Sequence, residues 1–266
     1  MSGHPSVLVL DVDGTLVDSV YLHTICWWQA FHQHGFEVPM VDIHRSVGMG
    51  ADHLVPHLLG PMSATYASAV TDEHRRLWHL WWARTRPTPG AGLLLREAQR
   101  MDLTVVLASS AAADELAAMR DVVGCEDCIT AAVGASDVSS SKPDPDVLSA
   151  ALERVGAQPE DALFVGDSRW DAAAARRVGV TFLGVMTGGV SELELLRAGA
   201  AAVYTDPGEL AMWLSTWVGY GPAFVGQAEG GPRPSSCDGF WAGAVAGAPG
   251  CHAGRLDVHQ SGTTPT

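Results

Sequence analysis

Two aspartates near the start of the chain have the spacing of a catalytic or metal-binding pair. Asp11 and Asp13 lie at the end of the segment Val7–Val12 and just after it, and the composition of that segment is that of a buried β-strand. Because side chains alternate along a strand, both carboxylates should project from one face, where they repel each other unless a cation or a shared proton lies between them. Mg²⁺ prefers such oxygen ligands. Gly14 permits a sharp exit and Thr15 can anchor the turn, so the pair is typical of either a metal site or a simple Asp-Gly turn.

Two further polar segments could bind an anion. Ser109 and Ser110 follow a second predicted strand, and hydroxyl and N–H groups at a helix start either bind phosphate or cap the helix. Lys142 is the single lysine of a chain that has 15 arginines. Lysine supplies a compact charge that suits a phosphoryl oxygen. A solvated loop lysine is the alternative, but the exception in a chain that otherwise uses arginine favours a function.

Another pair of aspartates follows the predicted strand Ala162–Val165. Asp167 comes just after it, and Asp171 lies one helical turn further on. Asp167 can supply a third oxygen ligand, while Asp171 can orient that ligand or a metal-bound water. Capping of the helix by Asp167 and Ser168 is the alternative. Together, the predicted strand ends offer carboxylates, hydroxyls and a lysine, which can bind one metal ion and one phosphate.

The composition limits the classes of function. A formal net charge of −14, from 30 acidic and 16 basic residues, excludes a general nucleic-acid binder. No apolar stretch has the length of a signal peptide or membrane span, so we expect a soluble, cytoplasmic protein with no membrane partner. Cys125 and Cys128 form an isolated Cys-x-x-Cys pair, which we interpret as two incidental thiols rather than a zinc or redox site.

The scaffold that positions these residues is predicted to alternate strands and helices. Several predicted strands are apolar on both faces, as in a parallel sheet covered by helices. The fold class is therefore α/β, with a doubly wound parallel sheet. We expect strands at Val7–Val12, Leu103–Ala108, Ala162–Val165, Thr181–Val185 and Ala202–Thr205, and helices at Ala91–Arg100, Ala112–Val123, Pro145–Val155, Trp170–Val178, Glu192–Ala198 and Gly208–Trp217.

Two regions depart from this alternation. Residues 19–86 show no strand pattern and are predicted to be a helical cap, inserted into a core of residues 1–18 and 87–218. Ser19 is the predicted N-cap of its first helix, and Thr71 is predicted to open a later one. Residues 219–266 are rich in glycine and proline and are predicted to be a disordered tail.

Four motifs occur in a fixed order along the chain. They are Asp-Val-Asp-Gly-Thr-Leu-Val-Asp-Ser at residues 11–19, the strand-end serine, Ser-Lys-Pro-Asp-Pro at 141–145 and Gly-Asp-Ser-x-x-Asp at 166–171. This set resembles the haloacid dehalogenase (HAD) superfamily, whose members are mostly phosphatases. The resemblance covers residues 5–217 and implies a Rossmann-like core with an all-helical cap, as in the phosphoglycolate phosphatase and β-phosphoglucomutase-like subgroup.

The resemblance implies a role for each motif residue. Asp11 matches the nucleophile that forms an aspartyl-phosphate, and Asp13 matches the general acid and base. Ser109 and Lys142 match the phosphate binders, with Ser110 beside them. The implied Mg²⁺ ligands are the Asp11 carboxylate, the Asp13 carbonyl and Asp167, supported by Thr15 and Asp171.

Details of the motifs exclude neighbouring activities of the family. Dehalogenases of this group lack the second aspartate, which is present here as Asp13. Family phosphonatases use a cap lysine, and residues 16–90 contain none. Mutases resembling β-phosphoglucomutase carry Glu-Asp in place of Gly166-Asp167, a softer distinction that favours hydrolysis.

The cap follows the first motif, and caps of this kind close over the site and select the substrate. Residues 43–50 resemble a loop that reaches toward the substrate. There Arg45 either binds a second anionic group through its guanidinium fork or forms an ordinary surface salt bridge. The cap tryptophans are more typical of packing than of an aromatic pocket; they are Trp27, Trp28, Trp78, Trp81 and Trp82.

From these observations we expect a Mg²⁺-dependent phosphatase that acts through an aspartyl-phosphate on a small phosphorylated metabolite. A sugar phosphate or phosphoglycolate is the expected substrate type. The alternatives are a phosphomutase of the β-phosphoglucomutase type and a catalytically idle binding protein with this fold. The protein is expected to be a monomer or a homodimer.

Overall fold

The computed structural model describes residues 5–217. The predicted tail, residues 219–266, lies outside the described residues. Within residues 5–217, no helix combines the length and apolar character needed to cross a membrane.

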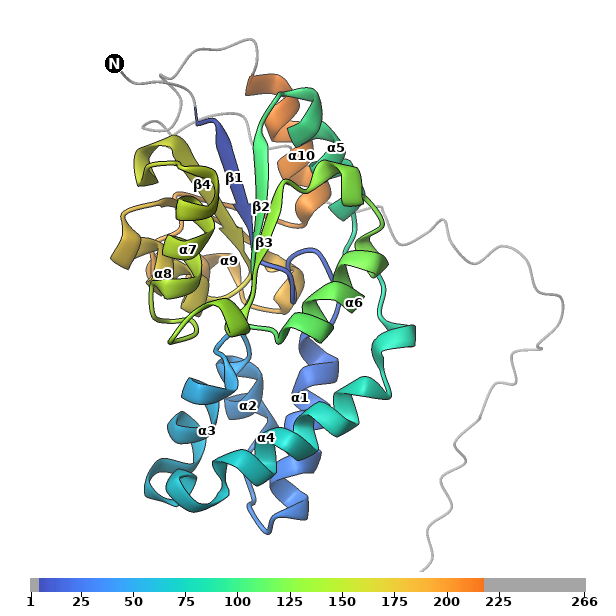
Figure 1. Cartoon of the computed structure of the whole chain (residues 1–266), viewed down its shortest axis with the longest axis vertical. Helices are drawn as coiled ribbons and strands as arrows, with labels where there is room; N and C mark the ends of the chain where they lie inside the picture. Colours follow the sequence, from blue (N-terminus) through green and yellow to red (C-terminus); the bar gives the residue numbers. More distant parts are fainter. Residues whose placement is uncertain (1–4, 218–266) are drawn as a thin grey trace, which may run out of the picture. The chain divides into compact units, whose positions relative to one another are not determined.

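A six-stranded sheet forms the centre of the core. All of its pairings are parallel, and its strand order is β3-β2-β1-β4-β5-β6 (Figure 1). This order confirms the predicted doubly wound, Rossmann-like α/β fold. The strands are β1 (Val7–Leu10), β2 (Thr104–Ala108), β3 (Ala131–Val133), β4 (Ala162–Gly166), β5 (Thr181–Val185) and β6 (Ala202–Tyr204).

Helices cover both faces of this sheet because its strands are apolar on both sides. In β1, Leu8 and Leu10 pack against one group of helices, while Val7 and Val9 pack against the other. The first group is α5 (Ala91–Arg100), α6 (Ala113–Val123) and α10 (Pro207–Trp217), and the second is α7 (Asp146–Val155), α8 (Arg169–Val178) and α9 (Glu192–Ala198).

Four helices follow β1 and pack around a separate apolar cluster. They are α1 (Val20–Gln33), α2 (Met40–Ser46), α3 (Ala51–Leu59) and α4 (Ser63–His79). Trp78 is 1% exposed at the centre of that cluster and Trp27 is also buried in it, whereas Trp28 is exposed at the surface. This insertion is the all-helical cap that the fold class implied. Short 3₁₀ helices occupy Gly60–Met62, Trp82–Arg84, Glu126–Cys128, Ala135–Asp137, Pro159–Asp161 and Met186–Gly188.

Some local expectations were wrong. Strand β3 was missed because it has only three residues, Ala131–Val133, and little β-branched character. Helix α4 starts at Ser63, so Thr71 lies inside it rather than at its start. Ser19 stands at the N-cap position of α1 but does not cap it, because its hydroxyl donates to Asp13 at 2.5 Å.

The Cys-x-x-Cys pair also differs from the expectation of two incidental thiols. Cys125 and Cys128 are joined in a disulfide just after α6, with their Cα atoms 5.4 Å apart. Among the described residues, Cys26 is the free cysteine, and it is buried in the cap.

Candidate active site

The carboxyl ends of three adjacent strands bring the predicted residues together. Asp11 follows β1, Ser109 follows β2 and Asp167 follows β4, and these strands are neighbours at the centre of the sheet. Open α/β sheets bind ligands in the crevice at this edge. The topology therefore gathers side chains that are far apart in sequence.

Lys142 is the buried cation of this site, with only 2% of its surface exposed. Its Nζ donates to the carboxylate of Asp11, to Asp171 at 2.8 Å and to the Ala108 carbonyl at 3.2 Å. Burial alone would lower the pKa of Lys142, but the charges of Asp11 and Asp171 raise it above its ordinary value. The ammonium is therefore held charged beside Asp11.

Three buried carboxylates surround this ammonium. Asp11, Asp167 and Asp171 place their oxygens within 4.8 Å of one another. Burial, offset in part by Lys142, raises the pKa of Asp11 to about 7. Burial and the neighbouring charges of Asp11 and Asp171 raise the pKa of Asp167 well above its usual value. Lys142 cannot balance three ionised carboxylates, and a hard divalent cation fits this oxygen donor set.

The other motif residues hold these carboxylates in place. The Thr15 hydroxyl lies 3.3 Å from Asp11 Oδ2 and 3.4 Å from Asp167 Oδ1. Asp171 forms a capping box with Ser168, whose N–H donates to Asp171 Oδ2 at 3.1 Å, while the other Asp171 oxygen accepts from Lys142. Asp171 thus both starts α8 and supports Lys142.

Two glycines allow the chain to pass close to Asp167. A Cβ added at Gly14 or Gly188 would collide with the Asp167 carboxylate. Gly14 also has a φ of +77°, which favours glycine. Glycine is therefore required at the turn predicted after Asp13, because of both the backbone conformation and the lack of space for a side chain.

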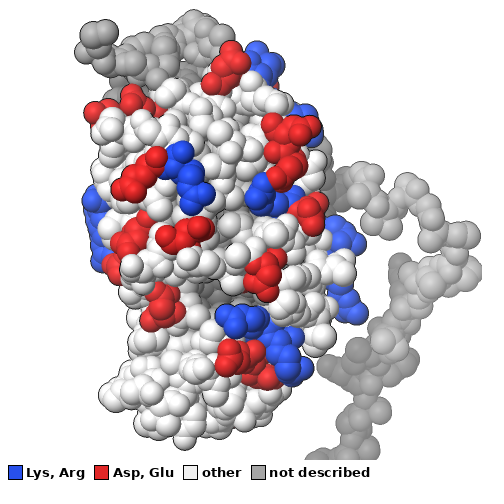
Figure 2. All heavy atoms as spheres, viewed as in Figure 1, with Lys and Arg blue, Asp and Glu red and all other residues white. Residues whose placement is uncertain are grey.

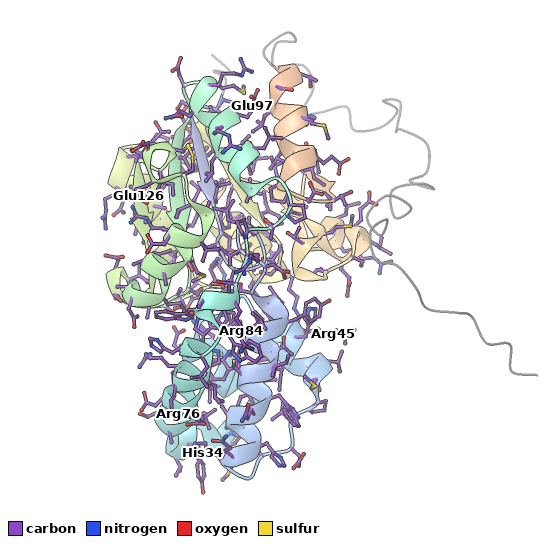
Figure 3. The ribbon with its side chains drawn as sticks, turned by 90° about the vertical axis from the view of Figure 1, so that its right-hand side faces the viewer. His34, Arg45, Arg76, Arg84, Glu97 and Glu126 are labelled. Atoms are coloured by element: carbon purple, nitrogen blue, oxygen red, sulfur yellow. A yellow bond between two sulfur atoms is a disulfide. The ribbon has the colours of Figure 1, made fainter. Side chains whose placement is uncertain are left out.

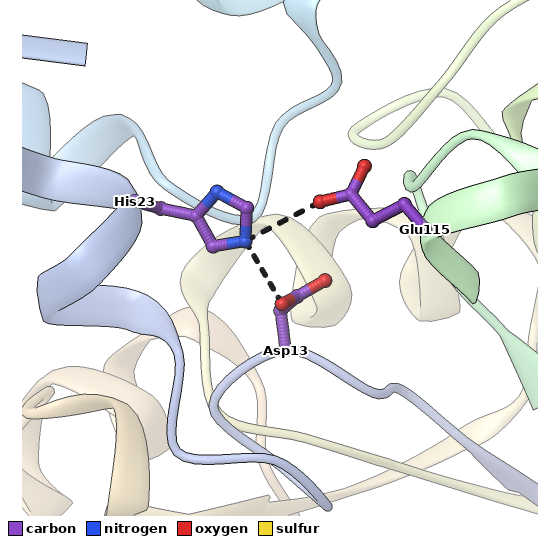
Figure 4. Close-up of side chains that lie close together, drawn as sticks. All are labelled: Asp13, His23 and Glu115. Carbon is purple, nitrogen blue, oxygen red and sulfur yellow. Dashed lines mark hydrogen bonds and ion pairs between the residues drawn. The ribbon is translucent and has the colours of Figure 1, made fainter. Parts of the chain in front are cut away.

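Asp13 points to a second cluster, made with residues that the sequence motifs did not identify. His23 Nε2 lies 3.0 Å from Asp13 Oδ1 and 3.6 Å from Glu115 Oε1 (Figure 4). His23 comes from α1 of the cap and Glu115 from α6 of the core. The Asp13 carboxylate is therefore outside the Asp11, Asp167 and Asp171 group, and any part that Asp13 has in binding a metal ion at that group falls to its main-chain carbonyl.

Burial and charge set the protonation of this second cluster. Burial raises the pKa of Glu115 to about 7. Although burial opposes it, the charge of His23 lowers the pKa of Asp13, and the charges of Asp13 and Glu115 raise the pKa of His23. Both pKa shifts favour a carboxylate at Asp13 paired with an imidazolium at His23.

A second histidine supports His23 from behind. His74 Nε2 lies 3.1 Å from His23 Nδ1, and the His74 ring stacks on Trp27 with ring centres 3.9 Å apart. Burial and the charge of His23 lower the pKa of His74 well below its usual value. The eleven histidines gave no spacing signal, because His23 and His74 lie on different helices, 51 residues apart.

The two serines after β2 occupy different positions. Ser109 is 1% exposed, and its hydroxyl accepts the Ala111 N–H at 3.0 Å. The Ser110 hydroxyl is buried, has no hydrogen-bond partner and lines the main pocket. The Ser110 hydroxyl is therefore free to meet an anion in the pocket, while the Ser109 oxygen accepts a bond within the turn and keeps its O–H available as a donor.

The main pocket has a volume of about 320 Å³ and is lined by both core and cap. Its cationic side chains are Lys142 and Arg75 of α4. Arg45 does not line it and instead faces a second pocket of about 260 Å³ beside Arg169 and Arg197. The Arg45 carbonyl accepts the Trp170 indole N–H at 3.0 Å, and Figure 3 shows Arg45 on the side of the cap close to the core. Residues 47–50 of the same loop line the main pocket, whereas Arg45 lines the second pocket together with Asp167 and Ser168.

Comparisons with known proteins agree with this arrangement. Residues 5–179 match the haloacid dehalogenase-like hydrolase family model. The chain is 29% identical over 221 residues to the phosphoglycolate phosphatase of Rhodospirillum rubrum, and the aligned region covers 79% of this chain and 91% of that protein. It is 27% identical over 200 residues to the validoxylamine A 7′-phosphate phosphatase of Streptomyces hygroscopicus subsp. limoneus, covering 68% and 84%.

Solved structures show the same fold. A hydrolase from Pseudomonas syringae superposes with a TM-score of 0.75 at 32% identity, covering 79% of this chain and 98% of that one. The β-phosphoglucomutase of Clostridium difficile superposes with a TM-score of 0.67 at 16% identity, covering 77% and 92%, and shares the fold.

Proposed function

Because the chain belongs to the haloacid dehalogenase-like hydrolases, we propose that it is a Mg²⁺-dependent phosphatase that acts through an aspartyl-phosphate. The observation that carries this proposal is the buried group in which Lys142 contacts Asp11 and Asp171, with Asp167 beside them. Asp11 and Asp167 would hold the metal ion, with the Asp13 carbonyl as the expected third protein ligand. When bound, Mg²⁺ supplies positive charge against the phosphoryl oxygens.

In the first step, a carboxylate oxygen of Asp11 forms a bond to phosphorus, and the bond from phosphorus to the leaving oxygen breaks. Asp13 gives a proton to that leaving oxygen, which departs as an alcohol. Lys142 steadies the developing negative charge beside Asp11. The proton is available because the His23 imidazolium holds one at Nε2, one hydrogen bond away from Asp13 Oδ1.

In the second step, Asp13 accepts a proton from water as the water oxygen bonds to phosphorus. The bond between phosphorus and the Asp11 oxygen breaks, which restores the Asp11 carboxylate and releases inorganic phosphate. Ser110, whose hydroxyl lacks a partner, is placed to donate to a phosphoryl oxygen in both steps. The buried position of Asp11, 3% exposed, limits water access during the first step.

A small phosphomonoester of the sugar phosphate or phosphoglycolate type is the proposed substrate. The pocket of about 320 Å³ lies at the lower end of the roughly 300–1,000 Å³ range of small-molecule sites. Similar proteins named for phosphoglycolate and validoxylamine A 7′-phosphate support a compact phosphorylated metabolite. Arg75, on the cap side of the pocket, offers a guanidinium to a second anionic group.

The proposal is tested with the purified chain, Mg²⁺ and an aryl phosphate. Asp11→Asn should abolish phosphate release, while Asp121→Asn, at an exposed position of α6, serves as the matched control and should retain it. Full activity of Asp11→Asn, or full activity in excess chelator, would disprove the mechanism. Measuring alcohol and inorganic phosphate together separates a hydrolase from a mutase, since a mutase releases little phosphate.

A further inference from the structure

The pocket contains a second group of metal-ligating side chains, separate from the carboxylates around Lys142. Asp13, His23 and Glu115 each offer one ligand atom, and these atoms lie within 4.8 Å of one another (Figure 4). The residues come from the loop after β1, from α1 and from α6. All three line the main pocket, so an ion that enters the pocket can reach them.

The donor set differs from that of the proposed Mg²⁺ site. Asp11, Asp167 and Asp171 offer only oxygen, which suits a hard cation. Asp13, His23 and Glu115 offer two carboxylates and one imidazole, and an imidazole nitrogen favours zinc and related transition metals. Three protein ligands with one remaining open position is a common arrangement for a reactive Zn²⁺ site.

His74 provides the support that a metal-binding histidine requires. Its Nε2 lies 3.1 Å from His23 Nδ1, and the two rings are 7% and 8% exposed. When His23 donates its Nδ1 proton to His74, the His23 Nε2 lone pair faces the two carboxylates. Metal-binding histidines nearly always donate their other N–H to a hydrogen-bond acceptor, usually a carboxylate, a carbonyl or a water, and here His74 Nε2 takes that place and fixes the tautomer and ring orientation of His23.

We propose that Asp13, His23 and Glu115 form a second metal site, selective for Zn²⁺ over Mg²⁺, whose occupation inhibits the enzyme. Zn²⁺ bound there takes the Asp13 carboxylate and the His23 Nε2, so neither can carry the proton that the leaving group needs. The ion also links α1 of the cap to α6 of the core through His23 and Glu115. The inhibitory part rests on the proposed phosphatase function, whereas the binding part does not.

Zinc binding is measured by calorimetry on the full chain saturated with Mg²⁺. The variants Glu115→Gln and His74→Gln should each weaken Zn²⁺ binding by about 10–100-fold, the effect typical of disturbing a metal site or its supporting shell. The matched control is His53→Gln. His53 Nε2 also faces two carboxylates, 3.2 Å from Asp144 and 3.6 Å from Asp52, but it is about one-third exposed.

The expected result is tight Zn²⁺ binding in the wild type and in His53→Gln that is weakened in the two cluster variants. Equal affinity in all four proteins, or no Zn²⁺ binding in the Mg²⁺-saturated wild type, overturns the proposal. Keeping the full chain means that zinc ligands outside the substituted position are the same as in the wild type, and His53→Gln measures the contribution of one histidine–carboxylate group outside the cluster. Zn²⁺ should also inhibit phosphate release from the wild type more strongly than from His74→Gln.

A readout on the wild type avoids any dependence on variants that fail to fold. Co²⁺ in an imidazole-containing, four-coordinate site absorbs visible light strongly, whereas Co²⁺ among six oxygens absorbs weakly. Strong absorption that Zn²⁺ removes and Mg²⁺ does not supports the site, and weak absorption alone refutes it. Absence of phosphatase activity in every protein, with Zn²⁺ binding intact, would reject the proposed function and leave the metal site standing.

Discussion

Replacing Lys142 with methionine tests how the buried carboxylates of the active site are balanced. The side chain is 2% exposed, and its Nζ contacts Asp11 and Asp171 while lying 5.8 Å from the centre of the Phe164 ring. Methionine keeps most of the apolar stem and removes the charge. The change leaves the carboxylates of Asp11, Asp167 and Asp171 without their buried cation.

The expected loss follows from breaking a buried ion pair on one side. Such a change costs about 3–5 kcal/mol, because the remaining charge stays buried without a partner. The wild type already bears part of the cost of burying these charges. The pKa of Asp11 rises from 3.8 to about 7, which is equivalent to about 4 kcal/mol of lost stability at pH 8. Removing Lys142 takes away the charge and the hydrogen bond that hold the Asp11 pKa down, so the penalty grows.

The sign of the pH dependence follows from the raised pKa of Asp11. The folded state binds this proton more tightly than the unfolded state, so stability falls as the pH rises from about 4 through 7 and is recovered on acidification. The deficit of Lys142→Met should therefore be largest near pH 8 and should shrink toward pH 5. Added Mg²⁺ should reduce it at pH 8.

Urea unfolding in the presence of a chelator, at pH 5 and pH 8, measures this deficit. The control is Arg177→Gln, which removes a partly exposed cation paired with Asp144 and should cost less than about 1 kcal/mol. A loss in Lys142→Met no larger than that of the control, or a deficit larger at pH 5 than at pH 8, would refute the charge balance described above.

Two further predictions concern the cap side of the pocket. Because the pKa of Glu115 rises from 4.5 to about 7, the stability of the wild type should fall as the pH rises through that range. In Glu115→Gln this fall should be smaller by up to about 3 kcal/mol. Urea unfolding from pH 4 to 8 measures it, and an identical pH dependence of the unfolding free energy in both proteins would contradict it. Arg75→Gln should raise KM about tenfold for phosphomonoesters with a second anionic group, as expected for the loss of one charged hydrogen bond, and should leave aryl phosphates unchanged. Arg76→Gln is its control, because Arg76 pairs with Glu73, and a KM effect equal in both variants would exclude Arg75 as the contact.

The parts of the fold that follow from local pattern were predictable from the sequence. Helices α5 and α9 match their predicted limits, Ala91–Arg100 and Glu192–Ala198, because α5 has a clear apolar periodicity and α9 has a capping box at Ser191 and a glycine, Gly199, at its end. Strand β3 was not predictable, since Ala131–Val133 gains its place by pairing with β2 rather than by propensity. Tertiary pairing decides such short edge elements.

The same division holds at the active site. Asp11, Lys142 and Asp167 belong to sequence motifs. Their meeting in one site could be predicted, because a parallel sheet brings the carboxyl ends of its strands to one edge. His23 and Glu115 lie on helices from different layers, and no spacing in the sequence connects them. The place of Arg45 depends on how its loop packs: its carbonyl accepts the Trp170 indole N–H, and the residue lines the second pocket rather than the main one.

The charge of the pocket bears on how an acidic protein captures an anionic substrate. On the face in Figure 2, acidic and basic side chains are interspersed, and the chain as a whole carries a net charge of −14. The pocket itself is lined by Asp11, Asp13, Asp52 and Glu115 against Lys142 and Arg75. These four acidic side chains outnumber Lys142, Arg75 and the His23 imidazolium, so the side chains of the pocket alone give little net attraction for a phosphate dianion.

A cation bound in the pocket before the substrate arrives would supply this missing attraction. A divalent ion 4 Å from a phosphate charge contributes about 8 kcal/mol at an effective dielectric constant of 20, twice the value for unit charges. Because this attraction acts at close range, it is screened little by salt, unlike steering by a charged surface over a Debye length of about 10 Å. The rate of substrate capture should accordingly depend steeply on Mg²⁺ concentration and weakly on ionic strength, since the compensating charge is brought by the ion rather than by the fold.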